Sequence, residues 1–148
     1  MIVDTSALVA MIREEADATR YSEAIRQASD RRLSAANYVE LAAVIDGTND
    51  PVARGILDEV LRTFRIEIVP LTETQARIAR GAYERFGRGS GHPARLNLGD
   101  CFAYALARDL GEPLLFKGDD FRQTDIEVVI EPVRERRLSE ILAAYTAT

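Results

Sequence analysis

Short apolar runs alternate along the chain with longer stretches in which apolar residues recur every three or four positions. The short runs predict buried strands, and the longer stretches predict amphipathic helices. The predicted strands cover residues 1–3, 32–34, 66–69, 113–116 and 127–130. The predicted helices cover residues 5–13, 17–28, 37–45, 72–86, 98–110 and 138–147, and one more opens at Pro51.

Strands that alternate with helices are typical of an α/β fold, in which a mostly parallel sheet has helices on both faces. No repeat or linker divides the 148 residues, a length that suits one domain. We therefore expect a single three-layer α/β/α domain over residues 1–148, with a mostly parallel sheet of about five strands. Residues 131–148 are expected to form a C-terminal extension helix.

Four acidic positions fall where this fold would bring them to one edge of the sheet. Asp4 follows the first predicted strand, and the pair Asp119–Asp120 follows the fourth. Glu40 and Asp100 lie in the first turns of two predicted helices. A crossover helix runs antiparallel to its strands, so its first turn lies at the carboxyl edge of the sheet, where ligand sites form. We expect these carboxylates, including one member of the pair, to share a site.

Carboxylates gathered at one edge repel one another unless protons or cations intervene. Two unit charges about 4 Å apart cost roughly 1 kcal/mol in water and roughly 4 kcal/mol at the effective dielectric near a protein surface. An all-oxygen cluster without His or Cys suits a hard divalent cation, Mg²⁺ or Mn²⁺. The acids therefore favour metal-assisted phosphoryl chemistry.

Helix capping is a simpler explanation for two of the acids. Asn37 and Glu40 have the spacing of a capping box, and so do Asn97 and Asp100. Against pure capping, Glu40 stands in an otherwise apolar run, where a carboxylate without a partner is costly. Both roles stay open for these two acids.

The other acids also have simpler roles. Asp4 is a candidate N-cap, although Thr5 or Ser6 would serve instead. The pair Asp119–Asp120 follows a glycine and suits an ordinary turn. Each signal is weak alone, and the joint placement of the acids supports a shared site.

Composition and charge set further limits. The chain has 47% apolar and 29% charged residues, as globular proteins do, and no apolar stretch long enough to span a bilayer. The net charge of −5 argues against broad non-specific binding to nucleic acid, but the four proposed site acids account for much of it. No export signal is visible and Cys101 is the single cysteine, so we expect a cytoplasmic protein.

The other reactive residues do not suggest a second site. His92, the single histidine, lies in an irregular, glycine-rich loop over residues 87–97 and is expected to be solvated. Cys101 adjoins Asp100 on an apolar helix and is expected in the core. Ser-His-Asp hydrolysis, zinc chemistry and phosphate-cradling glycine motifs all lack their residues. Arg88 and Arg95 are candidates for contacts with substrate phosphates.

Five motifs, taken in order, are similar to those of a known family. They read IVDTSAL at 2–8, SAANYVE at 34–40, LNLGDCFAYALA at 96–107, PLLFKGDDF at 113–121 and TDI at 124–126. In their order and spacing they resemble the PIN-domain family, most closely its VapC toxins, over residues 1–130. The segment 131–148 extends past the usual end of such toxins, and the resemblance assigns it no role.

The resemblance implies a PIN-like domain and a Mg²⁺-dependent endoribonuclease, with Mn²⁺ as a substitute. Asp4 and Asp100 would be the principal metal ligands. Glu40 and the acid after the fourth strand would complete the catalytic pocket. Asp120 is favoured for the last position because it precedes Phe121, as in the family's Asp-Phe pair, and Asp119 would face a second metal or water.

A mechanism and two partners follow from the resemblance. A metal-activated water would attack an RNA phosphodiester, with no side-chain nucleophile. A cognate VapB-type antitoxin would neutralise the toxin, and the toxin would be a homodimer. The antitoxin is expected to bind a groove formed by apolar residues of the first two helices, Leu8, Val9, Ile12, Tyr21 and Ile25.

A phosphoaspartate receiver or an Asp-dependent phosphatase is the alternative on a similar sheet. Lys117 after the fourth strand fits a receiver loosely. A receiver, however, needs paired acids after the first strand and a single acid after the third. A phosphatase of this kind needs a second acid two positions after Asp4, where the chain has Ser6.

Overall fold

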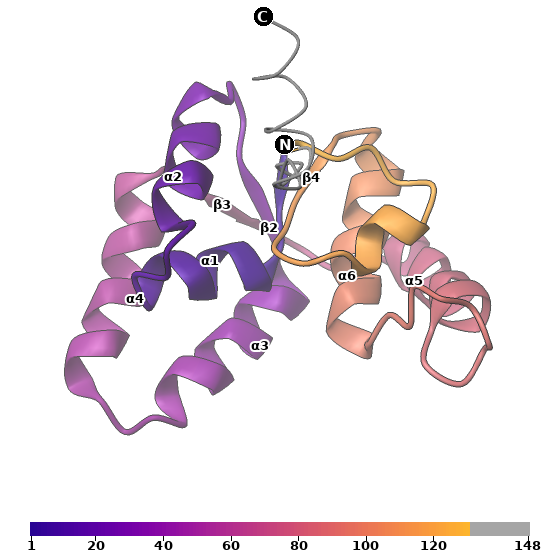
Figure 1. Ribbon diagram of the computed structural model, residues 1–148, viewed down its shortest axis with the longest axis horizontal. Helices are drawn as coiled ribbons and strands as arrows, with labels where there is room; N and C mark the ends of the chain where they lie inside the picture. The colour runs from indigo at the N-terminus through magenta and orange to yellow at the C-terminus, as the bar shows by residue number, and fades with distance from the viewer. Residues whose placement is uncertain (131–148) are drawn as a thin grey trace, which may run out of the picture.

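The computed structural model describes residues 1–130 and has a parallel sheet at its centre (Figure 1). The four strands are β1 (Ile2–Val3), β2 (Arg32–Ser34), β3 (Glu67–Val69) and β4 (Leu114–Leu115), in the order β3-β2-β1-β4. The chain runs outward from β1 to β3 and then returns to the other side of β1. The carboxyl ends of β1 and β4 therefore flank a topological switch point, where α/β folds place ligand sites.

The α/β class, the parallel sheet and the two helical layers are confirmed, but the fifth strand is not. Residues 127–130 were expected to be a strand, and within the described residues they form a single bridge between Val128 and Leu114. Leu114 donates its N–H to the carbonyl of Glu127 at 2.9 Å, and Val129 donates to the carbonyl of Leu114 at 3.1 Å. Only one residue pairs, so this segment borders β4 without extending the sheet.

Six α-helices and one 3-10 helix connect and follow the strands within residues 1–130. They are α1 (Thr5–Ile12), α2 (Ala18–Gln27), α3 (Ala35–Asp46), α4 (Pro51–Thr63), α5 (Glu73–Phe86), α6 (Leu98–Leu110) and η1 (Asp120–Gln123). Each predicted helix up to residue 110 is present with small changes at its ends. The helix predicted over residues 138–147 lies outside the described residues. No helix in the described part has the length and apolarity to cross a bilayer.

Two apolar cores lie on opposite faces of the sheet. Figure 1 shows α1, α2 and α4 to the left of the strands and α5 and α6 to the right. Neighbouring strand residues divide between the faces: Ile2 and Leu114 pack with α5 and α6, whereas Val3 and Leu115 pack with the other helices. This is the alternation expected of a strand buried on both faces.

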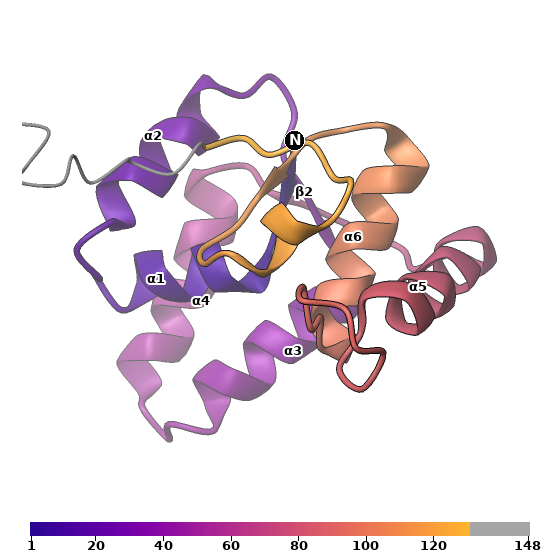
Figure 2. The ribbon, with the colours of Figure 1, turned by 45° about the vertical axis from the view of Figure 1, so that its right-hand side comes forward.

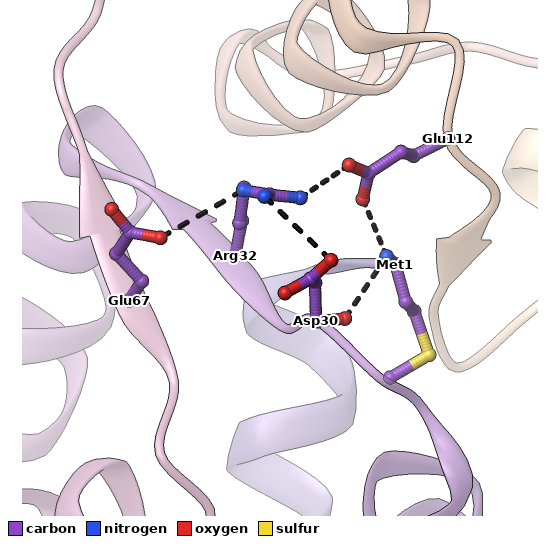
Figure 3. Close-up of polar contacts among 5 residues, drawn as sticks. All are labelled: Met1, Asp30, Arg32, Glu67 and Glu112. Atoms are coloured by element: carbon purple, nitrogen blue, oxygen red, sulfur yellow. Dashed lines mark hydrogen bonds and ion pairs between the residues drawn. The ribbon is translucent and has the colours of Figure 1, made fainter.

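The amino edge of the sheet is held by charged groups (Figure 3). Arg32 at the start of β2 pairs with Glu112, which precedes β4, and its guanidinium lies 3.8 Å from Glu67 at the start of β3 and 3.9 Å from Asp30. The amino group of Met1 also pairs with Glu112. These ion pairs join the starts of all four strands at the edge opposite the candidate site.

The apolar faces of α1 and α2 do not form the groove that was expected for an antitoxin. Leu8, Ile12, Tyr21 and Ile25 are buried in the core beneath the sheet, and Val9 is half-buried against it. These side chains fill the space between the first helices and the sheet, so that prediction is wrong.

Candidate active site

Asp4 links β1 to α1 and is almost completely buried, with 3% of its surface exposed. It is the N-cap of α1, a role that had been open to Thr5 or Ser6 instead. Its Oδ2 accepts hydrogen bonds from the Ser6 backbone N–H at 3.0 Å and the Ser6 hydroxyl at 2.6 Å. No hydrogen bond to Oδ1 is present within residues 1–130. Capping therefore uses one oxygen and leaves the other available to a ligand.

The ionised form of Asp4 is disfavoured by its surroundings. Burial raises the pKa of its carboxyl to about 7, and the negative charges of Asp100 and Glu40 act in the same direction. The hydrogen bonds from Ser6 oppose the rise but do not cancel it. The three acids that the sequence predicted to converge are therefore close enough to interact.

Asp100 lies in the first turn of α6, where it completes a capping box. Asn97 Oδ1 accepts from the Asp100 N–H at 2.8 Å, and Asp100 Oδ2 accepts from the Asn97 N–H at 2.9 Å. Burial raises the pKa of this carboxyl to about 6, helped by the charges of Asp120 and Glu40. The capping interpretation is correct here, yet it does not compete with a site, because it also occupies only one carboxylate oxygen.

Glu40 is not part of a capping box. Ser34 caps α3 by accepting the Ala36 N–H at 3.3 Å, so the helix starts at Ala35 and Glu40 lies in its second turn. Its Oε1 accepts a long hydrogen bond of 3.4 Å from Asn37 Nδ2. Figure 2 shows the starts of α3 and α6 side by side, and here the Glu40 carboxylate lies against α6.

The two acids after β4 have different surroundings. Asp120 opens η1, and its charge contributes to the raised pKa of Asp100. Asp119 is 87% exposed and lies 3.6 Å from the guanidinium of Arg122. The geometry places Asp120 toward the other acids, and its role in catalysis stays a prediction.

The four acids form no ion pair within residues 1–130. Arg88, at the start of the 87–97 loop, is the cation whose charge lowers the pKa of Asp100 against the rise. The loop ends are joined, because Arg88 donates its N–H to the Leu96 carbonyl at 3.0 Å and Leu96 donates to the Phe86 carbonyl at 2.9 Å. Arg88 is therefore held near the acids, where a substrate phosphate would also lie.

A hard divalent cation fits the chemistry of this donor set. The available atoms are carboxylate oxygens, and Asp4 and Asp100 each use one oxygen for capping. In the described part of the chain no three Asp, Glu, His or Cys side chains form a ready-made cluster for a metal. Mutual repulsion keeps ionised carboxylates apart, and a cation of opposite charge would draw them together.

Two other residues behave differently from each other. Cys101 is buried in the core, as expected. His92 was expected to be solvated, but its ring packs edge-on against Phe86 at 4.9 Å and its Nδ1 accepts the Ala94 N–H at 3.1 Å. The histidine therefore shapes the loop.

Sequence reasoning missed the part that Asn37 and Gly99 play beside Glu40. Asn37 was taken as a cap, but its completely buried side chain donates to the Gly99 carbonyl at 2.9 Å. The available signal was Ser34, a good N-cap three positions earlier, which places Asn37 inside the helix.

Comparisons with known proteins agree with this geometry. A model of the PIN domain matches residues 1–127. The chain is 53% identical to Ribonuclease VapC28 of Mycobacterium tuberculosis, over 88% of this chain and 98% of the relative. It is 50% identical to Ribonuclease VapC42 of the same species, over 85% and 96%.

Solved structures share the fold at low sequence identity. A toxin-antitoxin complex from Klebsiella pneumoniae matches with a TM-score of 0.65 and 17% identity, over 88% of this chain and 98% of that one. FitAcB from Neisseria gonorrhoeae matches with a TM-score of 0.64 and 18% identity, over 86% and 94%. The chain therefore belongs to the PIN-domain family, and within it to the VapC group.

Proposed function

We propose that this protein is a ribonuclease toxin that cleaves RNA phosphodiesters with the help of Mg²⁺ or Mn²⁺. The observation that carries the proposal is the buried, mutually repelling group of Asp4, Asp100 and Glu40, whose charges raise one another's cost of ionisation. The names of the VapC relatives, which are ribonucleases, support an RNA substrate. Groups with raised pKa values in a shared site are typical of catalytic centres.

Each acid has a distinct task in this proposal. Asp4 and Asp100 would hold the cation with the oxygens that capping leaves free, because Ser6 and Asn97 fix the orientation of the other oxygens. When bound, a divalent cation supplies Lewis-acid polarisation of the phosphodiester and of the attacking water. Glu40 and Asp120 complete the rim and are placed to orient that water or accept its proton.

Cleavage of RNA by the purified protein tests the proposal. The parent is expected to cut RNA with Mg²⁺ and to stop when EDTA removes the metal. Asp4→Asn and Asp100→Asn keep the size of each side chain and remove its charge, so both should lose nearly all activity. If both variants cut as fast as the parent, the assignment of the site is wrong. Cleavage that resists EDTA would show that the metal is not required.

An antitoxin of the VapB type is the proposed protein partner. The titles of the structural neighbours name toxin-antitoxin assemblies, which supports a partner of this kind. An antitoxin that covers the acidic rim would block the access of RNA. Co-purification with the product of the neighbouring gene is the expected result, and a chain that is harmless when overproduced alone would contradict it.

A homodimer is also proposed, and an apolar surface near the site supports it. A pocket of about 280 Å³ between α5 and α6 is lined by Ala76, Ala79, Arg80, Tyr83, Leu98 and Phe102. Leu98 is 62% exposed and Tyr83 is 44% exposed, and clustered apolar surface of this kind marks interaction sites. Light scattering of the purified chain should give twice the monomer mass.

A further inference from the structure

Asn37 joins the starts of three helices. Its buried Nδ2 donates to the carbonyl of Gly99 in α6 at 2.9 Å and more weakly to Oε1 of Glu40 at 3.4 Å. Its own carbonyl accepts a long hydrogen bond, 3.5 Å, from the hydroxyl of Thr5 at the start of α1. The same three helix starts carry the site acids. One side chain thus contacts every element that positions them, apart from the segment after β4.

The contacts of Asn37 serve its donor and neglect its acceptor. The Gly99 carbonyl can only accept, so Nδ2 must face it and the orientation of the amide is fixed. Oδ1 is then buried without a hydrogen-bond partner among the described residues. An unpaired buried acceptor is costly, so this amide is not explained by stability alone. Its placement is explained by what Nδ2 holds, which is Glu40 against α6.

Gly99 provides the space that the Glu40 carboxylate occupies. A Cβ at this position would lie 1.7 Å from Oε2 and 2.5 Å from Cδ of Glu40, whereas ordinary contact begins at 3.4 Å. Any side chain at position 99 would therefore push the carboxylate away from α6. The Asn37 amide and the missing side chain of Gly99 act on the same carboxylate from two sides.

We propose that Asn37 and Gly99 form a clamp that positions Glu40 beside Asp100. Both are positioning residues, because they act on the cation site through Glu40 and do not themselves contact substrate. This inference rests on the proposed function, since the clamp sets a carboxylate for the cation that the proposal requires. Residues that orient metal ligands typically change metal affinity by about 10- to 100-fold.

Gly99→Ala tests the clamp against a matched control, Gly55→Ala. Both glycines are helical, but a Cβ at Gly55 meets nothing within 4 Å. Alanine favours helix over glycine at both positions, so both variants should keep or raise the melting temperature. Calorimetric titration with Mn²⁺ alone should show affinity reduced about 10- to 100-fold for Gly99→Ala and unchanged for Gly55→Ala. Equal affinity in the parent and Gly99→Ala would overturn the clamp.

A double-mutant cycle shows whether the effect passes through Glu40. Glu40→Ala removes both the carboxylate and the clash. In that background Gly99→Ala and Asn37→Ala should each cause no further loss of Mn²⁺ affinity. If either still weakens binding by the same factor as in the parent, the residue acts by another route and the clamp is refuted.

The parent titration separates the two levels of the proposal. A parent that binds no Mn²⁺ and cuts no RNA would overturn the proposed function, and the clamp with it. A parent that binds Mn²⁺ while Gly99→Ala and Asn37→Ala bind it equally well would overturn the clamp alone. Unfolding curves of all variants in EDTA exclude loss of fold as the cause of weaker binding.

Discussion

Replacing Asp4 with Asn should make the metal-free protein more stable at pH 8. Asp4 is 3% exposed, and burial raises its pKa from an ordinary 3.8 to about 7, with Asp100 and Glu40 adding repulsion. Folding at neutral pH therefore requires an unfavourable charge to be buried. Asn is neutral and similar in shape, and its carbonyl oxygen can still accept the bonds from Ser6.

The magnitude follows from the two pKa values. A rise from 3.8 to about 7 corresponds to about 4 kcal/mol of lost stability once Asp4 is ionised. Below pH 3.8 the carboxyl is protonated in the folded and the unfolded chain, so there is no penalty. Between that pH and about 7 the unfolded chain loses the proton first, and stability falls as the pH rises. Above this range the penalty is constant.

Urea unfolding of the parent and Asp4→Asn in EDTA, from pH 4 to 8, measures the effect. The advantage of the variant should grow with pH toward an upper limit of about 4 kcal/mol. Asp58→Asn, at an exposed position in α4, is the control and should show no pH-dependent difference. A variant whose advantage is the same at pH 5 and 8, or which is less stable than the parent at pH 8, would refute the reasoning.

Three further predictions concern protons, packing and the alternative chemistry. Mn²⁺ affinity measured by calorimetry should fall from pH 8 to pH 5, because Asp4 and Asp100, with pKa values of about 7 and about 6, must lose their protons to bind it. Tyr104→Phe removes a 2.7 Å hydrogen bond to Asp125 and should cost about 1–2 kcal/mol in urea unfolding, while RNA cleavage stays unchanged. Incubation with acetyl phosphate should leave the intact mass unchanged, whereas a phosphoryl gain would favour the receiver alternative.

The convergence of the acids could be predicted because it depends on topology and not on side-chain detail. A parallel sheet places the residue after β1 and the first turns of the crossover helices at one edge, whatever their packing. Asp4 and Asp100 lie there as expected. The sheet was overestimated by one strand because the apolar run at 127–130 resembles a strand, and local pattern does not show whether a partner strand runs alongside it for more than one residue.

The two capping-box patterns show where sequence reasoning stops. Asn97 and Asp100 form the box, whereas Asn37 and Glu40, with the same spacing, do not. The difference lies outside the pattern, since Ser34 starts α3 early and turns Asn37 into a buried residue. That Asn37 then meets Gly99 across the interface of two helices depends on tertiary packing.

The central claim is that Asp4 and Asp100 share a cation. A crystal of the parent soaked in Mn²⁺ tests it through the anomalous signal of the metal. The account predicts a peak about 2.1 Å from an oxygen of each carboxylate, on the side that capping leaves free. A peak that contacts only one of them, or lies elsewhere on the molecule, would contradict it.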